Sequence, residues 1–297
     1  MGLSTLKKCL EMRKAAATLR KLTLPPSNSV DFSSNDYLGF ARDGAIQEAV
    51  AKELRSKGIG QGGSTGSRLL SGNSEYAETL EKRIASFHGT DAALLFNSGF
   101  DANYGVLSSV PQRGDAVIFD ELVHSSMREG IRASRAVSES FLHNDVSELR
   151  SCLERHRSFS CGGNLFVAVE SVYSMDGDMA PLRSIVEVAK EYRAEVIVDE
   201  AHGLGVTGAQ GRGLVHQEGL TEDVFATVYT FGKALGAHGA VVTGSEILRD
   251  YLIVSFFLPS PWRYCPCGVD PLRFVLLAAL VAELRPESDL FNSSSIA

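Results

Sequence analysis

The sequence contains few cysteines and no CxxC spacing. Only five of its 297 residues are cysteine, and no two of them have the spacing of a zinc site or a redox motif. A zinc-finger or dithiol-exchange function is therefore not indicated, and a reducing compartment is favoured. We predict a cytoplasmic protein, with mitochondria and peroxisomes as alternatives. The five cysteines are Cys9, Cys152, Cys161, Cys265 and Cys267.

The chain also lacks an excess of basic residues and a long apolar run. Its net charge is −7 and its pI is about 5.6, which argues against nucleic acid or an anionic membrane as partner. The late apolar run FVLLAALVA at 274–282 is too short to span a bilayer. With 44% hydrophobic residues the composition is that of a globular protein, and a small-molecule function is expected.

The N-terminal segment KKCLEMRKAAATLRK at 7–21 is basic and contains a single acidic residue. Such a segment is typical either of an amphipathic transit peptide or of a first helix. It leads into folded sequence without a break that resembles a cleavage site, so the helix is favoured. We assign residues 1–45 to an N-terminal helix and arm.

Short β-branched runs alternate with helical periodicity through the middle of the chain. The segments 74–89 and 181–194 each place apolar residues on one helical face, and strands separated by helices indicate βαβ units. The expected fold class is therefore α/β, a doubly wound and largely parallel sheet with helices on both faces. The predicted strands are DAALLFNSG, DAVIFDE, NLFVAVES, AEVIVDEAHG, ATVYTFGK and GAVVTGS.

Polar residues follow the predicted strands, and in such sheets ligands bind at the carboxyl ends of the strands. Lys233 follows an apolar strand, and a lysine desolvated there can form a Schiff base with a carbonyl cofactor. Asp199, at the end of another strand, can keep a pyridinium nitrogen protonated. The turn at Ser98, Gly99 and Phe100 opens a helix, which offers backbone N–H groups to a phosphate. Thr230 adds a hydroxyl near the lysine.

Each of these residues also has an ordinary structural interpretation. A lysine after a strand is usually a surface residue, a strand-end aspartate is usually a cap, and glycine turns are common. His124 and His202, taken singly, are more often structural than catalytic. Their succession on neighbouring strand ends, in one order, favours a shared site.

The chain resembles the α-oxoamine synthase family, pyridoxal-phosphate enzymes of the aspartate-aminotransferase fold (fold type I). The resemblance implies condensation of an amino acid with an acyl thioester, acyl-CoA or acyl carrier protein, with release of carbon dioxide. It also implies a homodimer with its site at the subunit interface. The motifs are DFSSNDYLGFA, GSTGSRLLSGNSEYAETLE, LLFNSGFDANYGVL, DELVHSSMREGIRAS, VESVYSMDGDMAPL, VIVDEAHGLGVTGAQGRG and TFGKALG.

The resemblance also implies a role for each matching residue. Lys233 would be the Schiff-base lysine and Asp199 the partner of the pyridinium nitrogen. The remaining assignments are His124 stacked on the cofactor ring, His202 on its phenolic oxygen, Gly99 and Phe100 at the phosphate through their backbone, Ser174 and Thr230 lining the pocket, and Asn35 near the substrate.

Two residues bear on the acyl substrate. An imidazole at the stacking position of His124 can pass a proton or hydrogen-bond an acyl carbonyl, which favours acyl transfer over simple transamination. RKAAATLRK resembles family members in which an arginine at the position of Arg20 reaches the acyl group, and a guanidinium suits an anionic acyl chain. The alternative for Arg20 is an exposed residue on a basic helix.

The resemblance ends near the C-terminus. We assign 46–255 to the cofactor-binding large domain and 256–297 to a divergent or truncated tail, because the family pattern is lost at about WRYCPCG. The family's smaller domain, with the arginine that holds the substrate carboxylate, is expected to be largely missing, and Arg263 and Arg273 no longer follow the pattern. The alternatives are an aminotransferase or other amino-acid enzyme with the same cofactor, and an inactive chain that pairs with a full-length subunit.

Overall fold

The computed structural model describes residues 2–24, 26, 28–58, 66–159 and 163–257. It divides into two compact units, Met1–Ser34 and Asn35–Ala297. The assignment of 1–45, 46–255 and 256–297 to separate domains stays a prediction. Most of the predicted C-terminal tail, including Arg263, Arg273 and the apolar run at 274–282, lies outside the described residues.

The first unit carries the predicted N-terminal helix, α1 (Leu3–Ala15), with Gly2 as its N-cap residue. No residue of α1 is buried, and its last turn carries Arg13 and Lys14. Basic side chains at that end interact favourably with the helix dipole. Arg20 follows α1 and is exposed.

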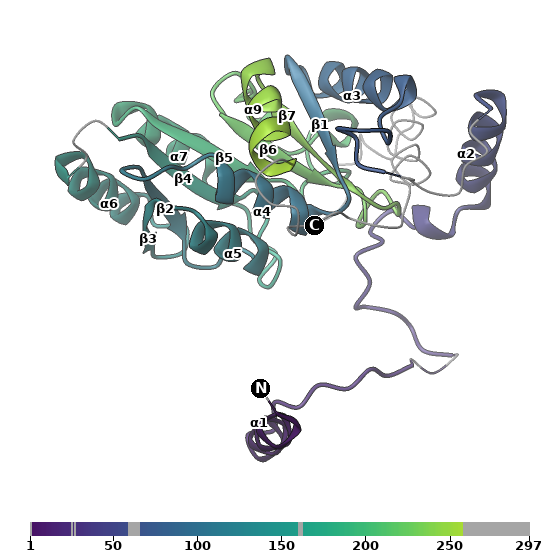
Figure 1. The fold of residues 1–297 in the computed structure, drawn as a ribbon, viewed down its shortest axis with the longest axis horizontal. Helices are drawn as coiled ribbons and strands as arrows, with labels where there is room; N and C mark the ends of the chain where they lie inside the picture. The colour runs from purple at the N-terminus through teal and green to yellow at the C-terminus, as the bar shows by residue number, and fades with distance from the viewer. Residues whose placement is uncertain (1, 25, 27, 59–65, 160–162, 258–297) are drawn as a thin grey trace. The chain divides into compact units, whose positions relative to one another are not determined.

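The second unit is built on a seven-stranded sheet with the order β1-β7-β6-β5-β4-β2-β3 (Figure 1). The strand β7 runs antiparallel to its neighbours β1 and β6, and every other pair is parallel. The strands are β1 (Ala92–Phe96), β2 (Ala116–Asp120), β3 (Val137–Phe141), β4 (Leu165–Glu170), β5 (Ala194–Asp199), β6 (Ala226–Thr230) and β7 (Ala240–Gly244).

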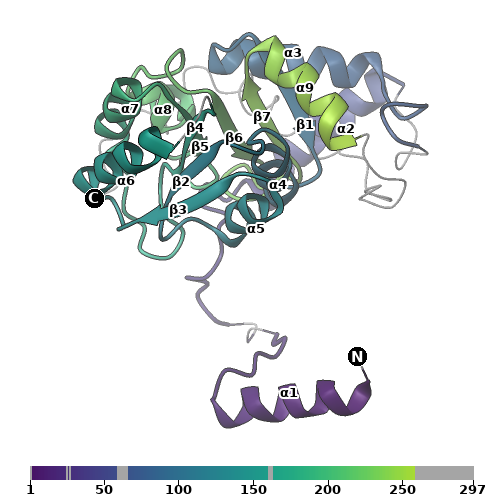
Figure 2. The same ribbon diagram turned by 60° about the vertical axis from the view of Figure 1, so that its left-hand side comes forward.

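Helices follow most of the strands and cover both faces of the sheet (Figure 2). Among the described residues, no helix combines the length and the apolar character needed to cross a membrane. The helices are α2 (Gly44–Ser56), α3 (Glu75–His88), α4 (Gly99–Ser109), α5 (Ser125–Ala133), α6 (Val146–Phe159), α7 (Leu182–Glu191), α8 (Leu214–Gln217) and α9 (Glu246–Phe257).

All six predicted strands and both predicted helical segments are present. The strand β3 was not predicted; its residues VSESF are mostly exposed, with only Phe141 buried. An edge strand needs little apolar surface, so it gives no strong pattern in the sequence.

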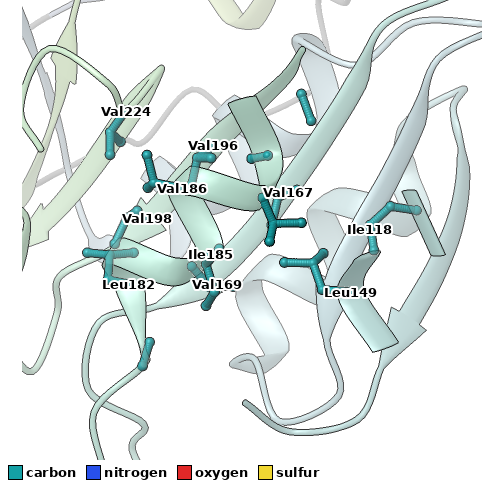
Figure 3. Packing of buried hydrophobic residues seen from close by; sticks show 14 of the residues in the cluster. Ile118, Leu149, Val167, Val169, Leu182, Ile185, Val186, Val196, Val198 and Val224 are labelled. Atoms are coloured by element: carbon teal, nitrogen blue, oxygen red, sulfur yellow. The ribbon is translucent and has the colours of Figure 1, made fainter. Parts of the chain in front are cut away.

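The core lies on both faces of the central strands. Val167 on β4 and Val196 on β5 pack with α6 and α7, whereas Phe166 and Ile197, one position away, pack with α4, α5 and α9. This alternation follows from the two-residue period of a strand, and Figure 3 shows the first of these clusters around Val167 and Ile185. Because both faces are covered, these strands read as continuous apolar runs.

A third cluster joins the segment after residue 35 to the loop that carries Lys233. Phe40 packs with Leu204, Phe231 and Leu235. Gly236 has a φ of +61°, and a Cβ there would lie 2.1 Å from the backbone nitrogen of Ala41. Only glycine allows this close approach, so the two segments meet where the strands β5 and β6 end.

Candidate active site

The polar residues gather at the carboxyl ends of adjacent strands. Glu170 ends β4, Asp199 ends β5, and these two residues are paired in the register of the sheet. Thr230 ends β6, and Lys233 follows it by three residues. Parallel neighbours therefore bring together side chains that are far apart in the sequence, as the strand pattern predicted.

Lys233 lies in a hydrogen-bonded chain that also contains His202 and Tyr37. Its Nζ is 2.5 Å from His202 Nε2, and His202 Nδ1 is 2.6 Å from the Tyr37 hydroxyl oxygen. Tyr37 donates its only hydrogen to Asn35 Oδ1 at 3.1 Å. His202 must then donate through Nδ1 and accept from Lys233 through Nε2, which assigns it the neutral state.

The electrostatics agree with this assignment. Burial, followed by the positive charge of Lys233, lowers the pKa of His202 to about 4. Burial also lowers the pKa of Lys233, although the carboxyl groups of Asp199 and Glu170 oppose this shift. A lysine with a lowered pKa has a larger neutral fraction, which is the nucleophilic form.

Asp199 is buried, with 3% of its surface exposed. Its Oδ1 accepts from the Ala201 backbone N–H at 2.8 Å, and its Oδ2 accepts from Asn103 Nδ2 at 2.7 Å. Asn103 lies on α4, one helical turn after Gly99, and also donates to Ser126 Oγ at 3.1 Å. The two donors fix the position of the Asp199 carboxyl group, which suits it to contact a cationic partner.

His124 is the N-cap residue of α5. Its Nδ1 accepts the Ser126 backbone N–H at 3.2 Å and lies 2.7 Å from Ser126 Oγ. Its own backbone N–H donates to Glu170 Oε1 at 2.5 Å. Burial lowers the pKa of His124, Asp199 opposes this shift, and Lys233 adds to it, so all three groups lie within one electrostatic environment.

Glu170 is buried, and its pKa is raised well above the usual value of a glutamate. Burial raises its pKa to about 8, and the charge of Asp199 adds to this, while the backbone N–H of His124 opposes it. Two carboxyl groups side by side cannot both ionise cheaply. Glu170 therefore keeps its proton at neutral pH.

The start of α4 lies against the end of β6. Ser98 is the N-cap residue, and its Oγ accepts from the Asp101 backbone N–H at 3.1 Å. A Cβ at Gly99 would lie 3.2 Å from both Cβ and Oγ1 of Thr230. Glycine thus lets the helix N-terminus approach Thr230 closely, and the backbone N–H groups at a helix N-terminus are suited to form a cradle for an anion.

The remaining predicted residues lie less centrally. Phe100 is 47% exposed, and Ser174 is exposed on the turn after β4, where its backbone interacts with the Glu170 carboxyl group. Asn35 is exposed and reaches the site through Tyr37. Arg20 belongs to the other unit, so its substrate contact stays a prediction.

Four residues of the site were not singled out by the sequence analysis: Asn103, Ser126, Glu170 and Tyr37. Each stands inside a motif that was noted, and two of them had a usable signal. Asn103 follows Gly99 at helical spacing, and Glu170 ends an apolar strand just as Asp199 does. The contact of Tyr37 with His202 joins positions 165 residues apart, and local patterns carry no information about such a pairing.

The fold is shared with known proteins. The model of the aminotransferase class I and II family matches residues 27–257. The chain belongs to this family. The 8-amino-7-oxononanoate synthase of Emericella nidulans is 46% identical over 260 residues, which are 84% of this chain and 63% of that enzyme. The predicted resemblance to α-oxoamine synthases is confirmed.

Solved structures of related enzymes have the same fold. The serine palmitoyltransferase of Sphingomonas wittichii superposes with a TM-score of 0.79 at 29% identity, over 97% of this chain and 72% of that one. A serine palmitoyltransferase from S. paucimobilis, solved with a bound PLP-myriocin aldimine, gives a TM-score of 0.77 at 27% identity, over 97% and 74% of the two chains. The predicted α/β fold of aminotransferase type is confirmed. The chain spans about three fifths of the length of the curated relatives that it matches.

Proposed function

We propose that this protein binds pyridoxal 5'-phosphate and condenses an amino acid with an acyl thioester, with loss of carbon dioxide. The observation that carries the proposal is the partly desolvated Lys233 amine, hydrogen-bonded to a neutral His202 near the Asp199 carboxylate. The 46% identity to an 8-amino-7-oxononanoate synthase supports the acyl-transfer reaction.

The residues present fit this cofactor. Lys233 offers an amine for its aldehyde, Asp199 a carboxylate for its ring nitrogen, and the N-terminus of α4 a cradle for its phosphate. The buried Oδ1 of Asn103 has no hydrogen-bond partner within the described part of the chain. Buried polar atoms normally have a partner, so this oxygen is available to a bound molecule. Ser174 and the backbone of Phe100 would complete the phosphate site.

When bound, pyridoxal phosphate supplies a ring that withdraws electrons from the α-carbon of the amino acid. Lys233 Nζ would take the proton from that carbon, because its lowered pKa leaves it partly neutral. Asp199, which accepts two hydrogen bonds, would keep a proton on the ring nitrogen. His202, which donates through Nδ1 to Tyr37, would orient Lys233 without competing for its proton.

His124 would act on the acyl substrate. Its Nδ1 accepts a backbone N–H, so the neutral ring carries its hydrogen on Nε2. That N–H can donate to the carbonyl oxygen of a thioester as the new carbon–carbon bond forms, and it stabilises the negative charge that develops there. Asn35 and Arg20 are proposed to contact the substrate as well.

We further propose a homodimer located in the cytoplasm. Phe100, Leu122 and Val206 follow the ends of β1, β2 and β5 and are 40–47% exposed. Apolar side chains around a polar site are typical of a surface that a partner subunit covers. Sedimentation of the purified protein tests the homodimer, and a monomer at all concentrations would contradict it.

The reaction is tested by incubating the protein and pyridoxal phosphate with alanine, glycine or serine and a panel of acyl thioesters. The panel includes the dicarboxylic acyl thioester that would give 8-amino-7-oxononanoate from alanine. We expect free thiol and carbon dioxide to be released in equal amounts. Conversion of the amino acid to an oxo acid without consumption of thioester would show an aminotransferase instead.

A further inference from the structure

Asn103 contacts two functional groups of the site at once. It lies on α4, it is 2% exposed, and both hydrogen bonds leave from its Nδ2. One goes to Asp199 Oδ2 at 2.7 Å and the other to Ser126 Oγ at 3.1 Å. An amide nitrogen has two hydrogens, so both are used.

The contact with Ser126 continues to His124. Ser126 is completely buried, and its Oγ accepts from Asn103, so its single hydroxyl hydrogen is free to point to His124 Nδ1 at 2.7 Å. The backbone N–H of Ser126 donates to the same nitrogen. His124 Nδ1 therefore receives two donors and stays unprotonated, which leaves the ring hydrogen on Nε2.

We propose that Asn103 is a positioning residue that joins Asp199 to His124 through Ser126 and fixes the ring of His124 with its hydrogen on Nε2. Directly, Asn103 holds the Asp199 carboxylate in place. Through Ser126 it sets the orientation and tautomer of the imidazole. The inference rests on the proposed function only for the roles of Asp199 and His124, because the hydrogen-bonded path itself needs no cofactor.

The direction of the hydrogen bonds predicts a measurable shift. Donors to Nδ1 favour the neutral imidazole, so their removal raises the pKa of His124. Loss of one such hydrogen bond corresponds to about half to one pKa unit. The other titratable groups around His124 are Asp199 and Lys233, His202, which interacts electrostatically with it, and Glu170, which accepts its backbone N–H. Ser126→Ala replaces none of them.

The test is a titration of His124 by ¹⁵N NMR on protein labelled in histidine, without added cofactor. A His124→Gln variant assigns the signal. In the wild-type protein we expect a protonated Nε2 and an unprotonated Nδ1 at neutral pH. In Ser126→Ala we expect the midpoint to move upward by about half to one unit. In Asn103→Ala, where the Ser126 hydroxyl keeps its hydrogen but loses the donor that orients it, we expect a smaller upward shift.

The matched control is Asn164→Ala. Asn164 donates through Nδ2 to the buried Asp115 at 3.2 Å, near the start of β4 and the opposite end of the sheet. It has the same type of Asn–Asp bond, and its loss should leave the midpoint of His124 unchanged. A shift of equal size in this variant would mean that general destabilisation moves the signal, and it would overturn the proposal.

A double variant tests the path. If the effect passes through Ser126, then Asn103→Ala adds little to the midpoint once Ser126 is alanine. A full additional shift in the double variant, or an unchanged midpoint in Ser126→Ala, would overturn the proposal. Because Ser126→Ala removes one oxygen atom only, it remains informative if Asn103→Ala does not fold. Failure of the wild-type protein to take up pyridoxal phosphate would contradict the proposed function and leave this result intact.

Discussion

The strands β4 and β5 differ sharply between their middles and their carboxyl ends. In the middle, Val167 and Ile197 are completely buried among apolar side chains. At the ends, Glu170 and Asp199 are almost as deeply buried, but they carry carboxyl groups. Burial of apolar surface stabilises the fold, whereas burial of carboxyl groups costs free energy unless they are paired. The middles of these strands therefore stabilise the fold, whereas the buried carboxyl groups at their ends lower its stability.

The largest expected effect is at the strand ends. Asp199→Asn keeps the shape of the side chain and removes the carboxylate that we propose holds a protonated ring nitrogen. With pyridoxal phosphate bound, exchange of the α-proton of alanine in D₂O should fall by about 10²–10³-fold. The exchange is followed by NMR.

Asp115→Asn is the matched control for this variant. Asp115 is buried before the first residue of β2, at the other end of the sheet, and accepts from backbone N–H groups of Gln112 and Asn164. Its replacement should lower stability and leave the exchange rate of the folded protein unchanged. Equal exchange in the Asp199→Asn and wild-type proteins would remove Asp199 from its proposed role.

Substitutions in the middle of the strands should lower stability and leave cofactor binding unchanged. Ile197→Ala leaves a cavity between β5 and the helices α4 and α5, and we expect the free energy of unfolding to fall by about 2–5 kcal/mol. Urea denaturation measures this change. The fraction that remains folded should bind pyridoxal phosphate with wild-type affinity, and a parallel loss of affinity would mean that the two regions are not separable.

Two glycines that begin helices differ in the space around them, one at the candidate site and one away from it. Gly99 and Gly44 are the first residues of α4 and α2. A Cβ at Gly99 meets Thr230 at 3.2 Å, but a Cβ at Gly44 meets nothing within 4 Å. Gly99→Ala should weaken binding of pyridoxal phosphate by about ten-fold, because the phosphate cradle must shift.

Gly44→Ala should leave cofactor affinity unchanged and stabilise the protein by up to about 1 kcal/mol. Spectroscopic titration with pyridoxal phosphate measures the affinity of both variants. The same loss in both would show that the start of α4 is not the phosphate site.

The smallest effect concerns the end of β2, beside the site. His143 contacts the buried Asp120 at 3.0 Å and Asp178 at 2.8 Å. Burial alone would lower the pKa of His143, but the two carboxylates outweigh it and raise the pKa. The resulting stability is fully present below the unfolded pKa and is lost as the pH rises through the folded pKa.

The wild-type protein should therefore be more stable than His143→Gln at about pH 5.5 by on the order of 0.5–1 kcal/mol, and this difference should shrink by about pH 8.5. Urea midpoints of both proteins at the two pH values measure this difference. A difference that grows with pH would contradict the assignment.

The sequence predicted the middles of the strands better than their surroundings. Apolar runs such as 194–199 reveal a buried strand directly, and the polar residues that follow them indicate a candidate site, so Lys233, His202 and Asp199 could be proposed for it. The edge strand β3 has no such run. Asn103 and Tyr37 contact the site through tertiary packing, and only Asn103 had a local signal, its helical spacing from Gly99.

The position of Lys233 is the most direct test of the proposed site. The purified protein is incubated with pyridoxal phosphate, reduced with borohydride, digested, and its peptides are mapped by mass spectrometry. We expect the cofactor mass on Lys233, because it is the lysine whose pKa is lowered by burial and whose Nζ contacts His202. A label on another lysine, or none, would contradict the assignment of this strand end as the active site.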